Sequence, residues 1–308
     1  MNSVYKNFFR NLYLKTGGFL PTKPINQNIY PGDFFQIKNG QMIVLGNIYR
    51  SDIVSRENHI LSSGDRLNGQ SWKFKHDVTK PYSGEGAGDN NLQGPSGFTK
   101  QILAFNSPGS HFFYGEDPES VRILNWSDIH QELIVKLTQT YYTFRDVYLV
   151  TECATLANWT LAISSSETGE LIFETNSKNL GILEGFGHYN SKTIQSKDIE
   201  YYHREPNRKP AFFKAKKLAV HDDKFNDFIN ELMNQNVEKN NWVSDFFDYD
   251  FYNDSVSVMP DISVNTHIST IDMLKANELN PNSALLYFKW IDANLDDIEK
   301  LFQTYDNQ

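Results

Sequence analysis

The stretch 145–164, RDVYLVTECATLANWTLAIS, carries the clearest strand pattern in the chain. Its first part, VYLVTEC, is rich in β-branched and aromatic residues, which favour strands. In its second part apolar residues alternate with small or hydroxyl-bearing ones, the two sets being Trp159, Leu161 and Ile163, and Thr160, Ala162 and Ser164. Alternation with a period of two places one set on each face of a strand. We predict two strands of a hairpin, the second half-buried, with no catalytic group in either.

Elements on both sides of this stretch indicate a sheet with flanking helices. Residues 4–15 and 127–142 carry apolar residues at helical spacing. Residues 34–46, FFQIKNGQMIVLG, predict a hairpin, because Asn39-Gly40 between two apolar runs is a strong turn signal. Further strands are predicted at 101–105, 110–115, 120–126, 170–175 and 211–220, with ETGE, 167–170, as a turn. Residues 62–100 show little periodicity, the glycine-rich 83–97 predict a mobile loop, and 203–210 predict a polar loop.

Charge divides the chain into two unequal parts. The net charge is −9, yet the stretch 222–308 holds 17 acidic side chains and 5 lysines, a net of −12. The stretch 1–221 therefore holds 24 basic and 21 acidic side chains, a net of +3. We predict an α+β domain with a twisted, largely antiparallel sheet over 1–222, and a helical acidic C-terminal segment over 223–308 with helices at 222–235, 269–279 and 293–305. The tail either improves solubility or covers a basic surface until it is removed.

Composition favours a folded protein that is cytoplasmic on synthesis. Hydrophobic residues make up 39% and charged residues 22% of the 308 residues. No apolar run approaches the roughly 18–20 residues of a membrane-spanning helix, and the N-terminus lacks the pattern of a signal peptide. Cys153 is the single cysteine, so neither an internal disulfide nor a cysteine metal cluster is expected.

Catalytic patterns are weak. The eight histidines have no metal-ligand spacing, and no metal or other cofactor is predicted. GEGAG, 84–88, lacks the preceding strand and following helix of a phosphate-binding loop, and a body with a net charge of +3 is a poor nucleic-acid binder. Cys153 in mid-strand reads as a buried small hydrophobe rather than a nucleophile. His203 with Glu205 remains an alternative acid–base pair, although a loop charge cluster is the commoner explanation.

Three basic clusters lie beside aromatic residues. They comprise Lys6, Arg10 and Lys15 in the first helix; Arg208 and Lys209, with Arg204, in the 203–210 loop; and Lys214, Lys216 and Lys217 after Phe212 and Phe213. Aromatic rings enter the interface of a bilayer while cations meet anionic head groups. We predict these cations as lipid contacts, with solvated surface charge as the alternative.

The order of elements resembles the pore-forming domain of gasdermins, the bacterial members in particular. The resemblance rests on the N-terminal helix, on IYPGDFFQIKNGQMIVLG at 29–46, and on RDVYLVTE at 145–152 after a helix. It covers roughly 4–50 and 120–222, whereas residues 55–110 lie outside it. Bacterial gasdermins commonly carry a lipidated cysteine near the N-terminus, and residues 2–10 contain none. The tail is also longer than the short C-terminal peptide of typical bacterial members.

The resemblance implies an autoinhibited protein and not an enzyme. A protease would cut within 234–260, the freed domain would bind anionic lipid and assemble into a ring, and its hairpins would refold into a barrel. Cell death in anti-phage defence follows from the resemblance, with an inner-membrane location after activation. The membrane-inserting hairpin would include Val147, Leu149, Trp159, Leu161 and Ile163. The alternatives are a binding module whose acidic-aromatic tail docks a protein partner, and an enzyme using His203 and Glu205.

Overall fold

The computed structural model shows an α+β protein built mostly from antiparallel sheets with few helices. It describes residues 3–38, 40–67, 71–79, 83–86, 98–138, 147–175, 186, 192–224, 227 and 281–302. The predicted fold class is confirmed at this level. Helical elements are α1 (Ser3–Thr16), η1 (Arg56–Asn58), α2 (Trp126–Thr138), η2 (Asp222–Lys224), α7 (Pro281–Tyr287) and α8 (Leu295–Lys300). Among the described helices, none has both the length and the apolarity needed to cross a bilayer.

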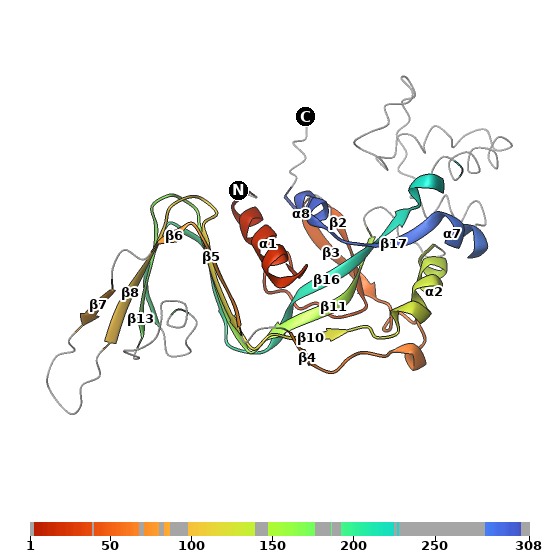
Figure 1. Cartoon of the computed structure of the whole chain (residues 1–308), viewed down its shortest axis with the longest axis horizontal. Coiled ribbons are helices and arrows are strands. Elements are labelled where there is room, and N and C mark those ends of the chain that lie inside the picture. The colour runs from red at the N-terminus through yellow and green to blue at the C-terminus, as the bar shows by residue number, and fades with distance from the viewer. Residues whose placement is uncertain are drawn as a thin grey trace, which may run out of the picture.

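The strands form three sheets that follow one another across the molecule (Figure 1). The inner sheet contains β1 (Leu20–Pro21), β2 (Asp33–Lys38), β3 (Gln41–Asn47), β4 (Asp65–Arg66), β10 (Glu119–Arg122), β11 (Val147–Leu156), β16 (Lys209–Val220) and β17 (Phe288–Asp292). The middle sheet contains β5 (Ser71–His76), β9 (His111–Glu116), β12 (Asn158–Ser164) and β15 (Ile199–Glu205). The outer sheet contains β6 (Val78–Thr79), β7 (Ser83–Gly86), β8 (Phe98–Phe105), β13 (Gly169–Thr175) and β14 (Lys192–Lys197).

Four strand paths run through all three sheets in the same order. Path 1 is β4–β5–β6, path 2 is β10–β9–β8, path 3 is β11–β12–β13, and path 4 is β16–β15–β14. In every sheet path 1 pairs with path 2, path 2 with path 3, and path 3 with path 4. The fold is therefore one four-stranded antiparallel ribbon, bent once between the inner and middle sheets (the inner bend) and once between the middle and outer sheets (the outer bend).

The outer bend keeps the register of the ladder between paths 2 and 3, although the paired strands stop at His111 opposite Ile163 and resume at Phe105 opposite Gly169. Phe113 pairs with Leu161 in the middle sheet, and Leu103 pairs with Leu171 in the outer sheet. From the first pair to the second, the residue number falls on path 2 and rises on path 3 by the same amount. The two paths therefore have the same register on both sides of the bend. Within the bend the Ser164 amide still donates to the Ser110 carbonyl at 2.9 Å.

The stretch 145–164 is not a hairpin, and that prediction was wrong. β11 and β12 are successive parts of path 3, separated only by Ala157. Hairpin loops need at least two residues, so a single residue bends the path without reversing it. The predicted turn at 167–170 does not connect two paired strands either, because β12 pairs with β9 and β15 and not with β13. These residues lie at the outer bend.

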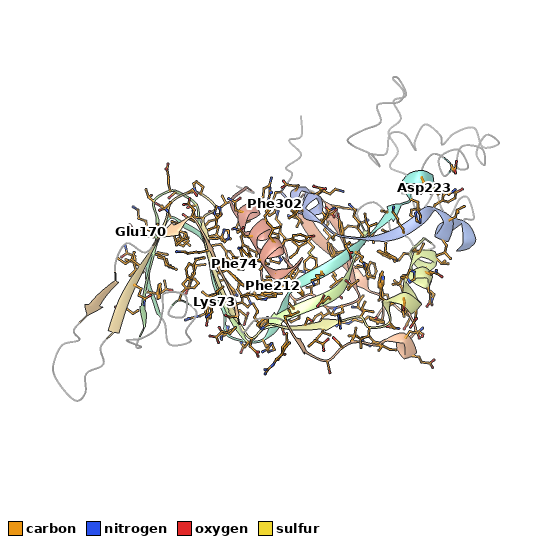
Figure 2. All side chains as sticks on the ribbon, in the orientation of Figure 1. Lys73, Phe74, Glu170, Phe212, Asp223 and Phe302 are labelled. Atoms are coloured by element: carbon orange, nitrogen blue, oxygen red, sulfur yellow. The ribbon has the colours of Figure 1, made fainter. Side chains whose placement is uncertain are left out.

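Helix α1 fills the angle between the inner and middle sheets (Figure 1). Its apolar face, with Phe8, Phe9 and Leu12, belongs to a cluster that also holds Trp72, Phe74, Phe113, Trp159, Leu161, Ile163 and Phe212. Figure 2 shows Phe74 and Phe212 among the side chains beside this helix. At its N-terminal end α1 comes so close to the outer bend that a Cβ on Gly109 would lie 2.9 Å from the Val4 carbonyl oxygen. This packing holds the middle sheet against the inner one.

The outer sheet folds back onto the other face of the middle sheet. Ala162, Phe112 and Tyr114 of the middle sheet pack with a cluster of outer-sheet residues, Val78, Leu103, Phe105, Leu171 and Phe173, and with Phe186. Strand β12 is therefore buried on both faces, with Trp159, Thr160, Leu161, Ala162, Ile163 and Ser164 at most 1% exposed. The prediction of a half-buried strand was wrong, because two separate layers cover it.

Three other local predictions need correction. Residues 62–100 contain β4, β5, β6, β7 and the start of β8, and the expected glycine-rich loop begins as strand β7, while 87–97 lie outside the described residues. The 203–210 loop is reduced to residues 206–208, since β15 ends at Glu205 and β16 begins at Lys209. The C-terminal segment, predicted to be helical, also contains strand β17, because the edge of β16 supplies its hydrogen-bond partners. The predicted helix at 269–279 and most of 222–235 lie outside the described residues.

Candidate functional site: a basic face beneath the C-terminal segment

Residues 281–302 are the last described part of the C-terminal segment. They lie along the edge of β16, the strand that carries the predicted lysines. Strand β17 pairs antiparallel with β16, from Lys216 opposite Asp292 to Val220 opposite Phe288. The ladder is extended by two further bonds, from the Ala293 amide to the Ala215 carbonyl at 3.0 Å and from the His221 amide to the Tyr287 carbonyl at 2.8 Å. An edge strand with unpaired backbone groups is a ready template for another strand, and here the tail occupies it.

Two of the four lysines on β16 are bound by carboxylates of the segment. The Lys216 Nζ lies 2.5 Å from an Asp292 carboxylate oxygen, and the Lys217 Nζ lies 2.7 Å from Asp297. Asp297 is only 2% exposed, and it also accepts hydrogen bonds from the Tyr148 hydroxyl at 2.8 Å and the Asn294 amide at 2.9 Å. A buried carboxylate with this set of donors is a compensated charge, which is the condition for burying one.

Helix α8 places a third carboxylate against α1. Glu299 forms ion pairs with Lys6 and, at 3.5 Å, with Arg10. Phe302 packs edge-on against Phe9, with ring centroids 5.0 Å apart (Figure 2 labels Phe302). Because Lys6 and Arg10 are one turn apart on α1, a single carboxylate reaches both cations.

Apolar and cationic contacts fix the two ends of the segment. At one end Tyr287 and Phe288 are buried, and Trp290 packs edge-on against Trp126 with its Nε1 donating to the His130 carbonyl at 3.0 Å. At the other end the Lys23 ammonium donates to the Leu301 carbonyl and lies 4.5 Å from the centroid of the Phe302 ring. Burial lowers the pKa of Lys23.

A second group of cations lines a cleft of about 420 Å³ beside the end of α1. Its lining includes Lys15, Lys214 and Lys73, with Phe19, Trp72 and Phe74 as aromatic walls. Lys214 also lies 3.3 Å from a Glu152 oxygen and above the Phe19 ring. The sequence predicted Lys15 and Lys214 separately, and the structure brings them together. Lys73 was missed, although Trp72 and Phe74 alternating with Lys73 and Lys75 carry the period-two signal of a strand.

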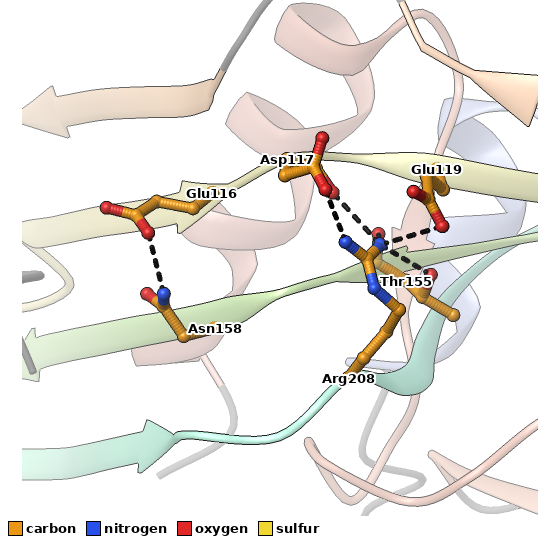
Figure 3. Close-up of polar contacts among 6 residues, drawn as sticks. All are labelled: Glu116, Asp117, Glu119, Thr155, Asn158 and Arg208. Carbon is orange, nitrogen blue, oxygen red and sulfur yellow. Dashed lines mark hydrogen bonds and ion pairs between the residues drawn. The ribbon is translucent and has the colours of Figure 1, made fainter.

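Arg208 and Lys209 lie away from the C-terminal segment, at the inner bend (Figure 3). The Arg208 guanidinium is 2.6 Å from Asp117 and 3.2 Å from Glu119, and it donates to the Thr155 hydroxyl at 3.2 Å. Asn158 donates to Glu116 at 2.7 Å in the same region, and Lys209 pairs with Glu205 at 2.7 Å. Arg208 thus joins paths 2, 3 and 4 where the ribbon turns, and Lys209 pairs within path 4.

No family model and no curated protein matches this chain.

The predicted membrane-inserting residues fall into two places along path 3. Val147 and Leu149 lie in the inner sheet, where Leu149 packs in the cluster that contains α2. Trp159, Leu161 and Ile163 lie in the middle sheet, facing α1. All five are buried. They share one strand path, but they do not form the two strands of one hairpin.

The alternative acid–base pair does not make a hydrogen bond. His203 Nε2 is 3.8 Å from Glu205 and has no hydrogen-bond partner. Burial lowers the pKa of His203. Burial alone would raise the pKa of Glu205, but hydrogen bonds from Lys209 and the Asn207 amide more than offset this and hold that pKa below its usual value. The pair is arranged to keep a buried carboxylate charged.

Neither Cys153 nor any described histidine belongs to a candidate metal-binding group. Cys153 is buried in the α1 cluster, and burial raises the pKa of its thiol well above the usual value, which disfavours the nucleophilic thiolate. Within the described ranges, no group of three or more His, Cys, Asp or Glu side chains could hold a metal ion.

Proposed function

We propose that this chain is an autoinhibited, gasdermin-like pore-forming protein that is released by proteolysis. One observation carries the proposal: four cations predicted as lipid contacts, Lys6, Arg10, Lys216 and Lys217, are each paired with a carboxylate of the C-terminal segment. The same segment covers the edge of β16 and part of the α1 cluster. Removing it would free a basic face, a strand edge and an apolar surface together.

The freed face suits an anionic membrane. Each cation near a negatively charged bilayer surface contributes on the order of 1 kcal/mol, and Phe9 beside Lys6 and Arg10 supplies an aromatic group for the interface. The acidic tail opposes this binding twice, by pairing the cations and by repelling anionic lipid. Lys15 and Lys214 at the cleft add to the same surface, whereas Arg208 and Lys209 act at the inner bend in the folded form.

The ribbon also has the geometry for assembly into a ring of copies. Its four paths alternate in direction, so the two edge strands of the middle sheet, β5 and β15, run antiparallel to each other. The β5 edge of one copy could therefore continue the sheet at the β15 edge of the next. Such a head-to-tail contact between two different edges gives a ring when the rotation between neighbouring copies closes, and an open filament when it does not. Lys73 and Lys75 on β5 and Glu200 on β15 are exposed and opposite in charge.

The remaining parts of the proposal follow from the resemblance. The protein stays in the cytoplasm until a protease cuts within 234–260, which lies outside the described residues, and the product acts at the inner membrane. It forms pores that kill the cell, as in anti-phage defence. The chemistry needs no cofactor and involves no nucleic acid.

The test uses the full chain with an engineered protease site inserted within 234–260, cut after folding. Dye-loaded vesicles containing an anionic phospholipid should leak after the cut and not before it. The matched variant carries Lys6→Gln and Lys216→Gln, which remove two of the paired cations, and its cut form should leak severalfold more slowly. Equal leakage before and after the cut, or none in either state, contradicts the proposal. A stable complex with a protein partner and no leakage would favour the binding-module alternative instead.

A further inference from the structure

The two faces of the outer sheet differ sharply. Leu103, Phe105, Leu171 and Phe173 point to one side and are at most 2% exposed; we call this the fold-back face. Residues that alternate with them on β8 and β13 are at least partly exposed, namely Ile102, Ala104, Glu170, Ile172 and Glu174. Alternation along each strand thus separates a mainly apolar face, with Gln101 as its polar member, from one that carries two carboxylates.

The fold-back face is hidden only because the ribbon doubles over on itself. Its residues pack against Phe112, Tyr114 and Ala162 of the middle sheet and against Phe186. Figure 1 shows the outer sheet descending beside the middle sheet from the outer bend. The outer sheet lies at the end of the molecule and buries its apolar face against a neighbouring sheet of the same chain. That face could instead be buried in an apolar solvent.

The outer bend can open without changing the register between the central paths. Paths 2 and 3 keep one register from Phe113 opposite Leu161 to Leu103 opposite Leu171. With β8 and β9 joined, path 2 extends from position 98 to position 116, and with β12 and β13 joined, path 3 extends from position 158 to position 175. A strand crosses a bilayer in about 9–11 residues, so both straightened paths are long enough.

We propose that the fold-back face is the surface that contacts lipid acyl chains after activation. This inference rests on the proposed function and deepens it by naming the face. Leu103, Phe105, Leu171 and Phe173 exchange their contacts with the middle sheet for contacts with hydrocarbon. Glu170 and Glu174 lie on the opposite face of β13 and stay in water, as alternation in a membrane-spanning sheet requires.

The experiment reads the environment of neighbouring residues on the two faces. Single cysteines at Leu171 or Leu103, and at the matched positions Ile172 or Ile102, are placed in a Cys153→Ala background of the full, cleavable chain. Each is labelled with an environment-sensitive fluorophore and cut in the presence of anionic vesicles. Lipids with a nitroxide on the acyl chain quench labels that touch hydrocarbon, and iodide quenches labels in water.

We expect acyl-chain nitroxides to quench the labels at 171 and 103 at least about threefold more strongly than those at 172 and 102, and iodide to show the reverse order. The uncut chain should show no nitroxide quenching at any position. Equal or stronger nitroxide quenching at 172 and 102 overturns the inference while leaving leakage intact. The inference is also overturned if the protein sediments with vesicles and the vesicles leak dye, but all of the labels are quenched by iodide alone.

A folding control keeps the result interpretable. Cysteine at Phe105 or Phe173 provides a second pair of fold-back labels if a variant at 171 or 103 unfolds, and thermal unfolding of each uncut chain reports its integrity. If the unlabelled cut chain neither binds vesicles nor leaks, the proposed function fails, and the inference that rests on it fails with it.

Discussion

His111 is a buried histidine whose hydrogen bonds fix the tautomer of its neutral form. The Gly109 carbonyl can only accept, so His111 Nδ1, 3.1 Å away, carries the proton, and Nε2 accepts from the Asn11 amide of α1 at 3.1 Å. The ring is fully buried, in contact with Phe8 and Phe74, and stacks on His76 with centroids 5.4 Å apart. One side chain therefore links α1 to the outer bend.

Acid should weaken the fold through this residue. Burial lowers the pKa of His111 from 6.5 to about 4, so between these values the unfolded chain binds a proton that the folded chain does not. The stability contributed by the neutral ring is complete above pH 6.5 and is lost progressively as the pH falls towards 4. Between pH 7 and pH 5 the loss is about 2 kcal/mol. Urea unfolding at both pH values should show it.

The matched variant is His111→Gln, whose amide keeps a donor and an acceptor but does not titrate. The fall in unfolding free energy between pH 7 and pH 5 should be smaller in this variant by about the same 2 kcal/mol. An equal fall in both proteins would show that other groups cause the acid sensitivity.

A single carboxylate, that of Asp297, makes several of the polar contacts that hold the C-terminal segment in place. Asp297→Ala leaves Lys217 and the Tyr148 hydroxyl without their partner, and removing one member of a buried pair costs about 3–5 kcal/mol. Lys217 is partly exposed, so we expect the lower end of that range. Asp296→Ala, at an exposed neighbour, should change stability by less than about 0.5 kcal/mol. Hydrogen exchange of the 288–302 amides in the uncut chain measures both, and similar effects of the two variants would contradict the assignment.

At the scale of elements, the outer bend is held by two similar contacts on the edge paths. Asp77 and Asp198 each stand alone between two strands with φ of 51°, in the left-handed region. Asp77 accepts hydrogen bonds from the Ser107 hydroxyl at 2.6 Å and the Asn106 amide at 3.2 Å, and Asp198 accepts one from the Thr168 hydroxyl at 3.0 Å. Both carboxylates thus bind the polar loops of the central paths, and the hydrogen bonds to Asp77 hold its pKa below the usual value.

Asp77→Asn with Asp198→Asn should loosen this bend. Asparagine tolerates the left-handed conformation as aspartate does, but the charge is lost and one acceptor becomes a donor. The backbone amides of Asn106 and Ser165 donate to the Asp77 and Asp198 carbonyls, and their hydrogen exchange should accelerate severalfold in the uncut chain. Asp52→Asn, at another left-handed aspartate outside the bend, is the control. No change in exchange would show that the carboxylates do not hold the bend.

The elements also show where local patterns mislead. The β2–β3 hairpin is confirmed because Gly40, with φ of 68°, supplies the turn that Asn39-Gly40 predicts. Strand β5 was missed although Trp72 and Phe74 alternate with lysines, and the glycine-rich stretch concealed β7. Over 147–164 the strand pattern predicts strands correctly but not their pairing, because pairing depends on partners far away along the chain, such as Glu116 opposite Asn158.

For the whole molecule, the charge asymmetry predicts that salt weakens the hold of the C-terminal segment. The stretch 222–308 carries −12 and the remainder +3, and all four paired cations are partly exposed to solvent screening. Between about 0.05 M and 0.5 M salt, the cut segment should bind about tenfold more weakly, or about 1.4 kcal/mol. Fluorescence anisotropy of a labelled, cut chain measures this. Glu299→Gln should flatten the dependence, and binding that is independent of salt would mean that apolar contacts alone hold the segment.

The sequence by itself determined the α+β class, the strand character of 147–164 and 211–220, and the imbalance of charge between body and tail. These features are local or additive, because period-two alternation, turn residues and net charge need no knowledge of distant contacts. Only the tertiary structure decided that four strand paths share one order through three sheets, that Asp292, Asp297 and Glu299 reach particular cations, and which face of the outer sheet is buried. Those outcomes depend on long-range pairing and on layers packing over both faces, and the apolar pattern of a single strand is compatible with several such arrangements.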